Sequence, residues 1–256
     1  MRNKAILIVS FGTSHLDALE KTIYTLQKDV ADAFSEYKIY SAFTSGIIIK
    51  KLAAAGVNIL NTEQALKAAI DNGVKELIVQ PSLIIEGDEY EKLCSTAEKY
   101  ANSFEKLSIG KPLLSAKSDY SAVVDIIASH FTEQIAEGLV LMGHGSENAA
   151  DVSYNRLQEM FIEQGYKNAI VGTVEGRLDI KSVMDKISAN GIVNATVAPL
   201  MLVAGDHAKN DMAGGEHSWQ TVMAKAGVNV SAVLKGLGEF KEIRNIYIEH
   251  IRSAIN

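Results

Sequence analysis

Three side chains that can bind a metal ion follow three separate apolar runs in the second half of this 256-residue chain: His144, Glu175 and His207. Two imidazoles and a carboxylate form a ligand set that suits a divalent first-row transition metal and leaves coordination positions open. A single histidine at such a place is more often a hydrogen-bonded structural residue, but three such residues together favour a binding site. We therefore predict that these side chains bind one metal ion.

The sequence of the first half is echoed in the second, and only the second copy carries the metal-binding residues. The equivalent positions in the first half are Phe11, Thr44 and Glu89, at offsets of 133, 131 and 118 residues. The surrounding segments also match, with PSLIIEGDE at 81–89 and PLMLVAGDH at 199–207. A duplicated scaffold with such residues in one copy predicts a single functional site.

Short apolar runs alternate with amphipathic stretches along the whole chain. Strands are expected at residues 4–10, 38–44, 77–83, 107–109, 138–142, 168–174, 194–201 and 228–233. Helices are expected at residues 16–34, 45–54, 63–72, 89–104, 122–134, 151–164, 180–190, 209–226 and 240–254. The strands are apolar at nearly every position, which is typical of parallel sheets covered by helices on both faces. This predicts an α/β protein with two doubly wound halves, residues 1–125 and 126–256, whose last helix can return to the first half.

The expected sheet explains how distant residues would meet. Ligands of open α/β sheets gather at the carboxyl ends of the strands. His144 lies two residues past an expected strand, Glu175 one residue past the next and His207 a few residues past the third. The spacing therefore predicts that all three side chains lie at one edge of one sheet.

Two glycines, Gly143 and Gly145, flank His144. They allow a sharp backbone turn and a close approach by a flat ligand, although a plain tight turn after a strand explains them equally. A phosphate-binding loop is disfavoured, because the G-H-G-S segment lacks the lysine and the glycine spacing of such loops.

Three acidic residues near helix starts have two interpretations each. Asp206 and Asp211 flank His207, where we expect them to cap the helix, while Asp206 is also placed to orient the imidazole. Glu89 would either face the site from the first half or stabilise the N-terminus of its own helix, and we favour the second interpretation.

Composition excludes several classes of protein. The net charge of −6 argues against nucleic-acid binding, which relies on clustered lysine and arginine. No apolar run approaches the roughly 18 residues of a membrane span, and the short N-terminal run has the character of a strand, not of a signal peptide. Cys94 is the single cysteine, so it is interpreted as a packing residue in a reducing, cytoplasmic protein.

Longer segments resemble one family, the sirohydrochlorin cobaltochelatases of the anaerobic cobalamin pathway in their large single-chain form. The similar segments are VSFGTS at 9–14, AFTSG at 42–46, MGHG at 142–145, VGTVE at 171–175, PLMLVAGDHAKNDMA at 199–213, SW at 218–219 and GLGE at 236–239. The block at 199–213 is highly specific, whereas the glycine motifs alone are not.

This resemblance implies the class II chelatase fold, with two Rossmann-like halves and a cleft between them. It implies ATP-independent insertion of Co²⁺ into sirohydrochlorin or its oxidised form, so that cobalt is the substrate metal, the tetrapyrrole is the small-molecule partner and no nucleotide is needed. His144, Glu175 and His207 then become the metal-binding residues. We expect His144 also to act catalytically by accepting a pyrrole proton, because imidazole titrates near neutral pH. A homo-oligomer is compatible with the sequence.

The chain departs from the family pattern at three places. Leu83 stands where the family often has histidine, and Glu86 stands where it often has proline or asparagine. Arg177-Leu178 stands where the family commonly has an aromatic residue followed by proline. Arg177 is interpreted either as a contact for a substrate carboxylate or as a solvated surface arginine.

Two alternatives to cobalt insertion stay open at this point. Insertion of Fe²⁺ or Ni²⁺ into the same tetrapyrrole would need the same ligands, and ligand type does not choose among these metals. A protein that binds tetrapyrrole or metal without catalysis would also explain a site of this composition.

Overall fold

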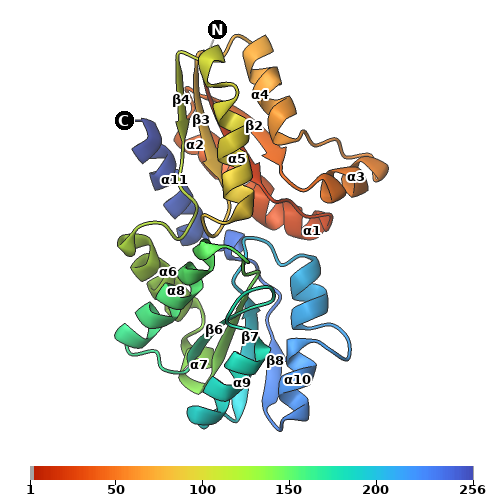
Figure 1. The fold of residues 1–256 in the computed structure, drawn as a ribbon, viewed down its shortest axis with the longest axis vertical. Coiled ribbons are helices and arrows are strands. Elements are labelled where there is room, and N and C mark those ends of the chain that lie inside the picture. The colour runs from red at the N-terminus through yellow and green to blue at the C-terminus, as the bar shows by residue number, and fades with distance from the viewer. Residues whose placement is uncertain (1–2, 256) are drawn as a thin grey trace. The chain divides into compact units, whose positions relative to one another are not determined.

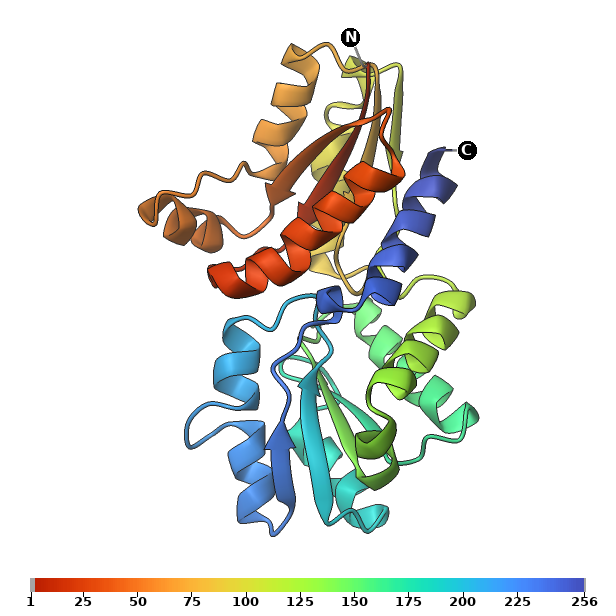
Figure 2. The same ribbon diagram turned by 180° about the vertical axis from the view of Figure 1, so that it is seen from behind.

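The computed structural model describes residues 3–255 and divides them into two α/β units. The first unit contains the chain up to Ser115 and returns from Gly238 onward, and the second unit is Ala116–Leu237. Figures 1 and 2 show these units from opposite sides, with the returning segment in dark blue. No helix within residues 3–255 combines the length and apolar character that crossing a bilayer requires.

Each unit is built on a four-stranded parallel sheet of the same topology. The first sheet has the order β2-β1-β3-β4 and the second has the order β6-β5-β7-β8. The strands of the first unit are β1 (Lys4–Ser10), β2 (Lys38–Phe43), β3 (Glu76–Pro81) and β4 (Lys106–Ile109). Those of the second are β5 (Leu139–Gly143), β6 (Ala169–Thr173), β7 (Asn194–Pro199) and β8 (Asn229–Ala232). The predicted α/β class and the internal duplication are therefore confirmed.

Helices connect the strands and cover both faces of each sheet. In the first unit they are α1 (Leu16–Leu19), the π-helical turn η1 (Glu20–Tyr24), α2 (Thr25–Ala33), α3 (Gly46–Ala54), α4 (Thr62–Asp71), α5 (Asp88–Glu98), the 3₁₀ turn η2 (Ala101–Ser103) and α11 (Lys241–Ile255). In the second unit they are α6 (Lys117–His130), α7 (Thr132–Glu137), the 3₁₀ turn η3 (Ala149–Asp151), α8 (Val152–Glu163), α9 (Ile180–Ala189), the π-helical turn η4 (Ala208–Met212) and α10 (Trp219–Lys225). A last 3₁₀ turn, η5 (Leu237–Glu239), lies where the chain passes back to the first unit.

The strands are apolar throughout because each face of a sheet meets a layer of helices. In β1, Leu7 and Val9 pack with α4 and α5 in one core, while α2 and α11 contact the sheet on its other side. In β5, Val140 and Met142 pack with α9 and α10, and α7 and α8 contact the strands from the other side. Figure 2 shows α2 and α11 together on one face of the first sheet. Covered faces of this kind account for the continuous apolar runs of the sequence.

Two of the expected helices are broken in the structure. The helix expected over residues 122–134 is divided at Phe131 between α6 and α7. A single helix was predicted over residues 209–226, whereas the structure has the turn η4, a break, and then α10. The break contains Gly214, where an added Cβ would meet the carbonyl oxygen of Asn210 at 2.5 Å. Ser218 then starts α10 by accepting the N–H of Thr221 at 3.3 Å, as helix N-cap residues do.

The division between the units also differs from the expected boundary at residue 125, which falls inside α6. This helix packs against α8 of the second unit, and Gln164 Nε2 donates to Ser121 Oγ at 3.0 Å. The whole of α6 therefore belongs to the second unit.

Polar contacts fix the C-terminal helix α11 in the first unit. Arg244 Nε lies 2.6 Å from Asp29 Oδ2, and the Tyr247 hydroxyl donates to the Leu83 carbonyl at 3.1 Å. Further along, His250 Nδ1 lies 3.1 Å from the carbonyl oxygen of Lys111.

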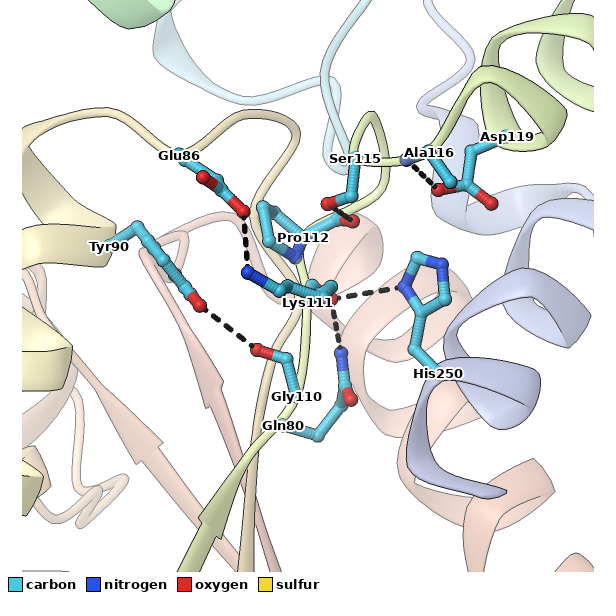
Figure 3. Close-up of polar contacts among 10 residues, drawn as sticks. All are labelled: Gln80, Glu86, Tyr90, Gly110, Lys111, Pro112, Ser115, Ala116, Asp119 and His250. Carbon is cyan, nitrogen blue, oxygen red and sulfur yellow. Dashed lines mark hydrogen bonds and ion pairs between the residues drawn. The ribbon is translucent and has the colours of Figure 1, made fainter. Parts of the chain in front are cut away.

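A buried glutamine completes this anchor, as Figure 3 shows: Gln80 Nε2 donates to the same Lys111 carbonyl at 2.8 Å. The helix is thus an integral part of the first unit. In the sequence, however, all residues of the second unit lie between α11 and the rest of the first unit.

Replacing Arg244 with Met should lower the free energy of unfolding by about 2 kcal/mol, because the partly buried Asp29 carboxylate loses its charged partner. Urea titration would measure this change. The matched control is Lys67→Met, which removes an exposed ion pair with Glu63 and should leave the urea midpoint nearly unchanged. Equal shifts in both variants would contradict the proposed importance of the Arg244 anchor.

Candidate metal site

Backbone hydrogen bonds define which residues of the two units are equivalent. Glu175 donates its N–H to the carbonyl of His144 at 2.8 Å, and Ser45 donates its N–H to the carbonyl of Phe11 at 3.3 Å. The equivalent of Glu175 is therefore Ser45, and the predicted pairing with Thr44 is wrong by one residue. The hydrogen-bond ladder of the sheet, and not the similarity of neighbouring residue types, therefore determines how the two units are aligned.

The three predicted metal-binding residues follow three adjacent strands of the second sheet. His144 comes directly after β5, Glu175 follows β6 by two residues and His207 lies at the helical start that leads into η4. Because the sheet order is β6-β5-β7, the residue after the central strand has the other two as neighbours. At this edge the connection that leaves β5 goes to β6 on one side, and the connection that leaves β7 goes to β8 on the other. Such a divergence between neighbouring strands is the usual place for a ligand in an open α/β sheet.

Distances place His144 between the other two residues. Its Nδ1 lies 3.7 Å from Glu175 Oε2, and its ring centroid lies 4.7 Å from that of His207 with the planes perpendicular. The 3.7 Å separation is measured to the ring nitrogen that faces the Gly145 carbonyl at 3.2 Å, and not to Nε2. It therefore shows that the His144 and Glu175 side chains are neighbours, but it is not a ligand spacing around an ion.

The three side chains do not yet form a complete coordination shell. Within residues 3–255, no group of three or more His, Cys, Asp or Glu side chains is already arranged to hold a metal ion. The side chains of His144, Glu175 and His207 are 41%, 58% and 35% exposed, so solvent reaches each of them and rotamer changes are not blocked by packing. Binding one ion would require rotations of this kind.

Asp211 determines which nitrogen of His207 is available. Its Oδ2 lies 2.6 Å from His207 Nδ1, one turn away along the chain. An ionised carboxylate can only accept a hydrogen bond, so Nδ1 carries the proton and Nε2 keeps its lone pair. Carboxylate–histidine pairs of this kind commonly orient metal ligands. The sequence assigned Asp211 to capping and offered Asp206 for this role, whereas the structure places Asp211 on the ring.

The turn after β5 depends on a glycine. Gly145 has φ +89°, in the left-handed region that favours glycine, and an added Cβ would meet the backbone nitrogen of Gly176 at 2.6 Å. Gly12, its equivalent in the first unit, has φ +101°. The sharp turn predicted around His144 is therefore a feature of both copies of the repeat.

A buried carboxylate, Asp151, also lies beside the two loops that carry His144 and Glu175. It is 1% exposed, its Oδ1 accepts the N–H of Ser146 at 3.2 Å and its Oδ2 accepts the N–H of Arg177 at 2.9 Å. Asp151 was not among the residues predicted for the site. A signal was present in the repeat, since the position 133 residues earlier is an alanine.

The packing beneath the turn comes from Tyr154, which is 2% exposed and lies where a Cβ on Gly143 would be. Burial raises the pKa of Tyr154 to about 12, and a backbone hydrogen bond with Gly145 acts in the opposite direction. The phenol therefore stays neutral at physiological pH and serves as a wall of the turn.

Three other predicted residues have ordinary surroundings. Glu89 lies in the first turn of α5 with its Oε1 2.8 Å from Lys92 Nζ, in line with the favoured helix-terminal role. Arg177 is exposed on the loop that follows Glu175. Cys94 is partly buried, and desolvation raises the pKa of its thiol, in keeping with a packing residue.

Comparison with known proteins identifies close relatives. A family model described as cobalt chelatase (CbiK) matches residues 4–256. The sirohydrochlorin cobaltochelatase of Salmonella typhimurium is 37% identical over 256 residues, which cover 99% of this chain and 97% of that protein. The sirohydrochlorin cobaltochelatase CbiKC of Nitratidesulfovibrio vulgaris is 27% identical over 261 residues, with coverage of 100% and 92%.

Solved structures agree on the fold. SirB from Bacillus subtilis, solved with Fe³⁺, superposes with a TM-score of 0.65 and 17% identity over 98% of this chain and 95% of that chain. CbiX, described as the terminal enzyme for siroheme biosynthesis in denitrifying bacteria, gives 0.61 and 17% over 99% and 100%. The two duplicated α/β units thus have the class II chelatase fold that the sequence predicted, and the chain belongs to the CbiK family of cobalt chelatases.

Proposed function

We propose that this protein inserts Co²⁺ into sirohydrochlorin or its oxidised form, without ATP, in the cytoplasmic, anaerobic route to cobalamin. Membership of the cobalt chelatase family and 37% identity to a sirohydrochlorin cobaltochelatase support the reaction. The single structural observation that carries the proposal is the contact of His144 with both Glu175 and His207 at one sheet edge.

The proposed roles of the three residues follow from which of their atoms have a lone pair free to bind the metal. His207, with Nδ1 bonded to Asp211, offers Nε2 to the incoming ion. Glu175 supplies an anionic oxygen that offsets part of the metal charge. His144 completes the ligand set, and its Nδ1 lies 3.2 Å from the Gly145 carbonyl, which leaves Nε2 as the atom with a lone pair.

Insertion also requires that two pyrrole N–H groups lose their protons. A metal-bound imidazole nitrogen cannot act as a base, so ligand and base roles exclude one another at any moment. We assign the base role to His144 after the macrocycle nitrogens have begun to replace it on the metal. Its freed lone pair then takes one pyrrole proton, and solvent water, which reaches this exposed site, takes the other. The electron pair left on each of the two pyrrole nitrogens binds the metal.

The substrate is a polycarboxylate, so cations near the site should help to bind it. Arg177 is exposed two residues after Glu175 and has the right charge for this contact. We propose it as a contact for a substrate carboxylate.

The central test replaces His144 or His207 with Ala and follows the absorbance change when Co²⁺ is added to sirohydrochlorin. The insertion rate should fall by about 100-fold or more in each variant, because each loses a metal ligand and the first also loses a base. His217→Ala, an exposed histidine of the same unit, is the control and should insert cobalt normally. Wild-type rates in both site variants would eliminate the proposed chemistry.

A second test addresses Asp211. Asp211→Ala should raise the Kd for Co²⁺ by about tenfold to 100-fold, since His207 loses the partner that fixes its ring and tautomer. Asp211→Asn keeps one accepting oxygen and should have a smaller effect. Equilibrium dialysis with Co²⁺ measures both, with Asp185→Asn as an exposed control in α9. An unchanged Kd in Asp211→Ala would show that this pair does not prepare a ligand.

Metal choice is tested by parallel assays with Co²⁺, Ni²⁺ and Fe²⁺ under one set of conditions. We expect the highest kcat/KM for Co²⁺, because the two relatives are named sirohydrochlorin cobaltochelatases. Faster insertion of either other metal would replace cobalt in the proposal. Tight binding of sirohydrochlorin with no insertion of any of the three would instead indicate a binding protein.

A further inference from the structure

Asp151 is an unusual carboxylate because it is buried without a charged partner. Its two hydrogen-bond donors are the backbone N–H groups of Ser146 and Arg177, and no cationic side chain among residues 3–255 pairs with it. Burying a carboxylate in this way is costly unless hydrogen bonds compensate. A residue retained at such a cost calls for an explanation.

The two donors have matching positions relative to the proposed ligands. Ser146 lies two residues after His144, and Arg177 lies two residues after Glu175. One carboxylate therefore bridges the loop after β5 and the loop after β6. The backbone bond from Glu175 to His144 joins the same two loops at their bases. We call the bridge from Asp151 to Ser146 and Arg177 the Asp151 clasp.

The loops are packed tightly where the clasp joins them. A Cβ added to Gly176 would collide with Asp151 Oδ1 and with Thr173 Oγ1. Thr173 Oγ1 is itself buried and has no hydrogen-bond partner within the described part of the chain. A small displacement of Asp151 would thus be transmitted to the backbone beside Glu175.

The first unit shows that the fold does not require this clasp. Its equivalent of Asp151 is Ala18, yet the turn before it is kept: Thr13 Oγ1 accepts the N–H of His15 at 3.2 Å. In the second unit Ser146 Oγ accepts the N–H of Asn148 at 3.3 Å in the same way. The turn is common to both units, and the carboxylate is an addition to one of them.

Gly176, which lies against the Asp151 clasp, also differs in its surroundings from its equivalent in the first unit. Gly46, the equivalent of Gly176, has no atom within 4 Å of an added Cβ. Crowding at Gly176 therefore comes from Asp151 and Thr173 and not from the repeat. The clasp occurs only in the unit that carries the two histidines and the glutamate.

We propose that Asp151 is a positioning residue for metal binding. It holds the His144 and Glu175 loops at the separation that lets both side chains reach one ion, and it does so without contacting the metal. This inference rests on the proposed function, because it assumes that His144 and Glu175 bind the substrate metal.

The test begins with Asp151→Asn, which keeps the shape of the side chain but places an NH₂ group against a backbone N–H. The Kd and KM for Co²⁺ should rise by about tenfold, while the KM for sirohydrochlorin stays within about twofold of the wild type. The visible spectrum of bound Co²⁺ should also change, because it reports coordination geometry. Asp179→Asn is the control, since Asp179 caps α9 through Ser182 and is exposed.

A second pair of variants tests the clasp without altering the carboxylate. Gly176→Ala pushes a methyl group against Asp151 and should weaken Co²⁺ binding with the same spectral change. Gly46→Ala, at the equivalent position in the first unit, should bind Co²⁺ like the wild type. If Asp151→Asn does not fold, the comparison of Gly176→Ala with Gly46→Ala tests the positioning role in its place. If Gly176→Ala also fails to fold while Gly46→Ala folds, Asp151 serves stability and the positioning role is overturned.

The His144→Ala variant separates failure of this inference from failure of the proposed function. If His144→Ala loses Co²⁺ affinity while Asp151→Asn and Gly176→Ala keep the wild-type Kd and spectrum, the positioning role is overturned and the proposed function stands. If His144→Ala itself binds and inserts Co²⁺ normally, both are overturned.

Discussion

The hydrogen bond from the Glu175 N–H to the His144 carbonyl expresses the constraint on which the candidate site depends. The carboxyl ends of parallel strands lie at the same edge of a sheet. Beyond β5 and β6, the next backbone hydrogen bonds continue the ladder of the sheet. The residues that follow β5 and β6 are therefore held side by side by backbone geometry alone. His207 approaches the same place from the connection that leaves β7 on the other side of β5. Side-chain chemistry is thus added to an arrangement that the sheet already provides.

Duplication explains how such an arrangement can change in one copy without loss of the fold. Both units keep the strand order, the glycine with positive φ after the first strand and the hydroxyl that closes the following turn. At the sheet edge the side chains that leave this frame differ, because Phe11, Ser45 and Ala18 of the first unit correspond to His144, Glu175 and Asp151 of the second. The repeat therefore distinguishes the residues common to both units from the residues that we propose to act in metal binding.

Much of this organisation was predictable from the sequence because it depends on local patterns. The apolar runs identified all eight strands, since buried parallel strands have no polar face, and the strand ends indicated where His144, Glu175 and His207 would lie. The alignment of the two units was harder to predict. Glu175 was matched to Thr44, one residue away from its true equivalent, because the backbone hydrogen bonds that set the alignment leave no local pattern in the sequence. The break before α10 was missed although Gly214 and Gly215 interrupt the apolar spacing there.

The partners of the site residues could not be read from the sequence for a related reason. The π-helical turn η4 brings the Asp211 carboxylate to His207, whereas helix capping was the more general expectation for both flanking aspartates. Asp151 was overlooked because its two hydrogen bonds go to backbone N–H groups, which carry no sequence signature. Tertiary contacts of this type become visible only when the loops are placed in space.

The return of α11 to the first unit has a consequence for biosynthesis. The ribosome releases Ala116–Leu237 as one continuous stretch, so that every residue of the second unit leaves the exit tunnel before α11 does. The first unit begins earlier but lacks part of one helical layer until α11 has been translated, because α11 contacts β3 and β4. Nascent chains should therefore complete their two units in the reverse of the order in which the units begin.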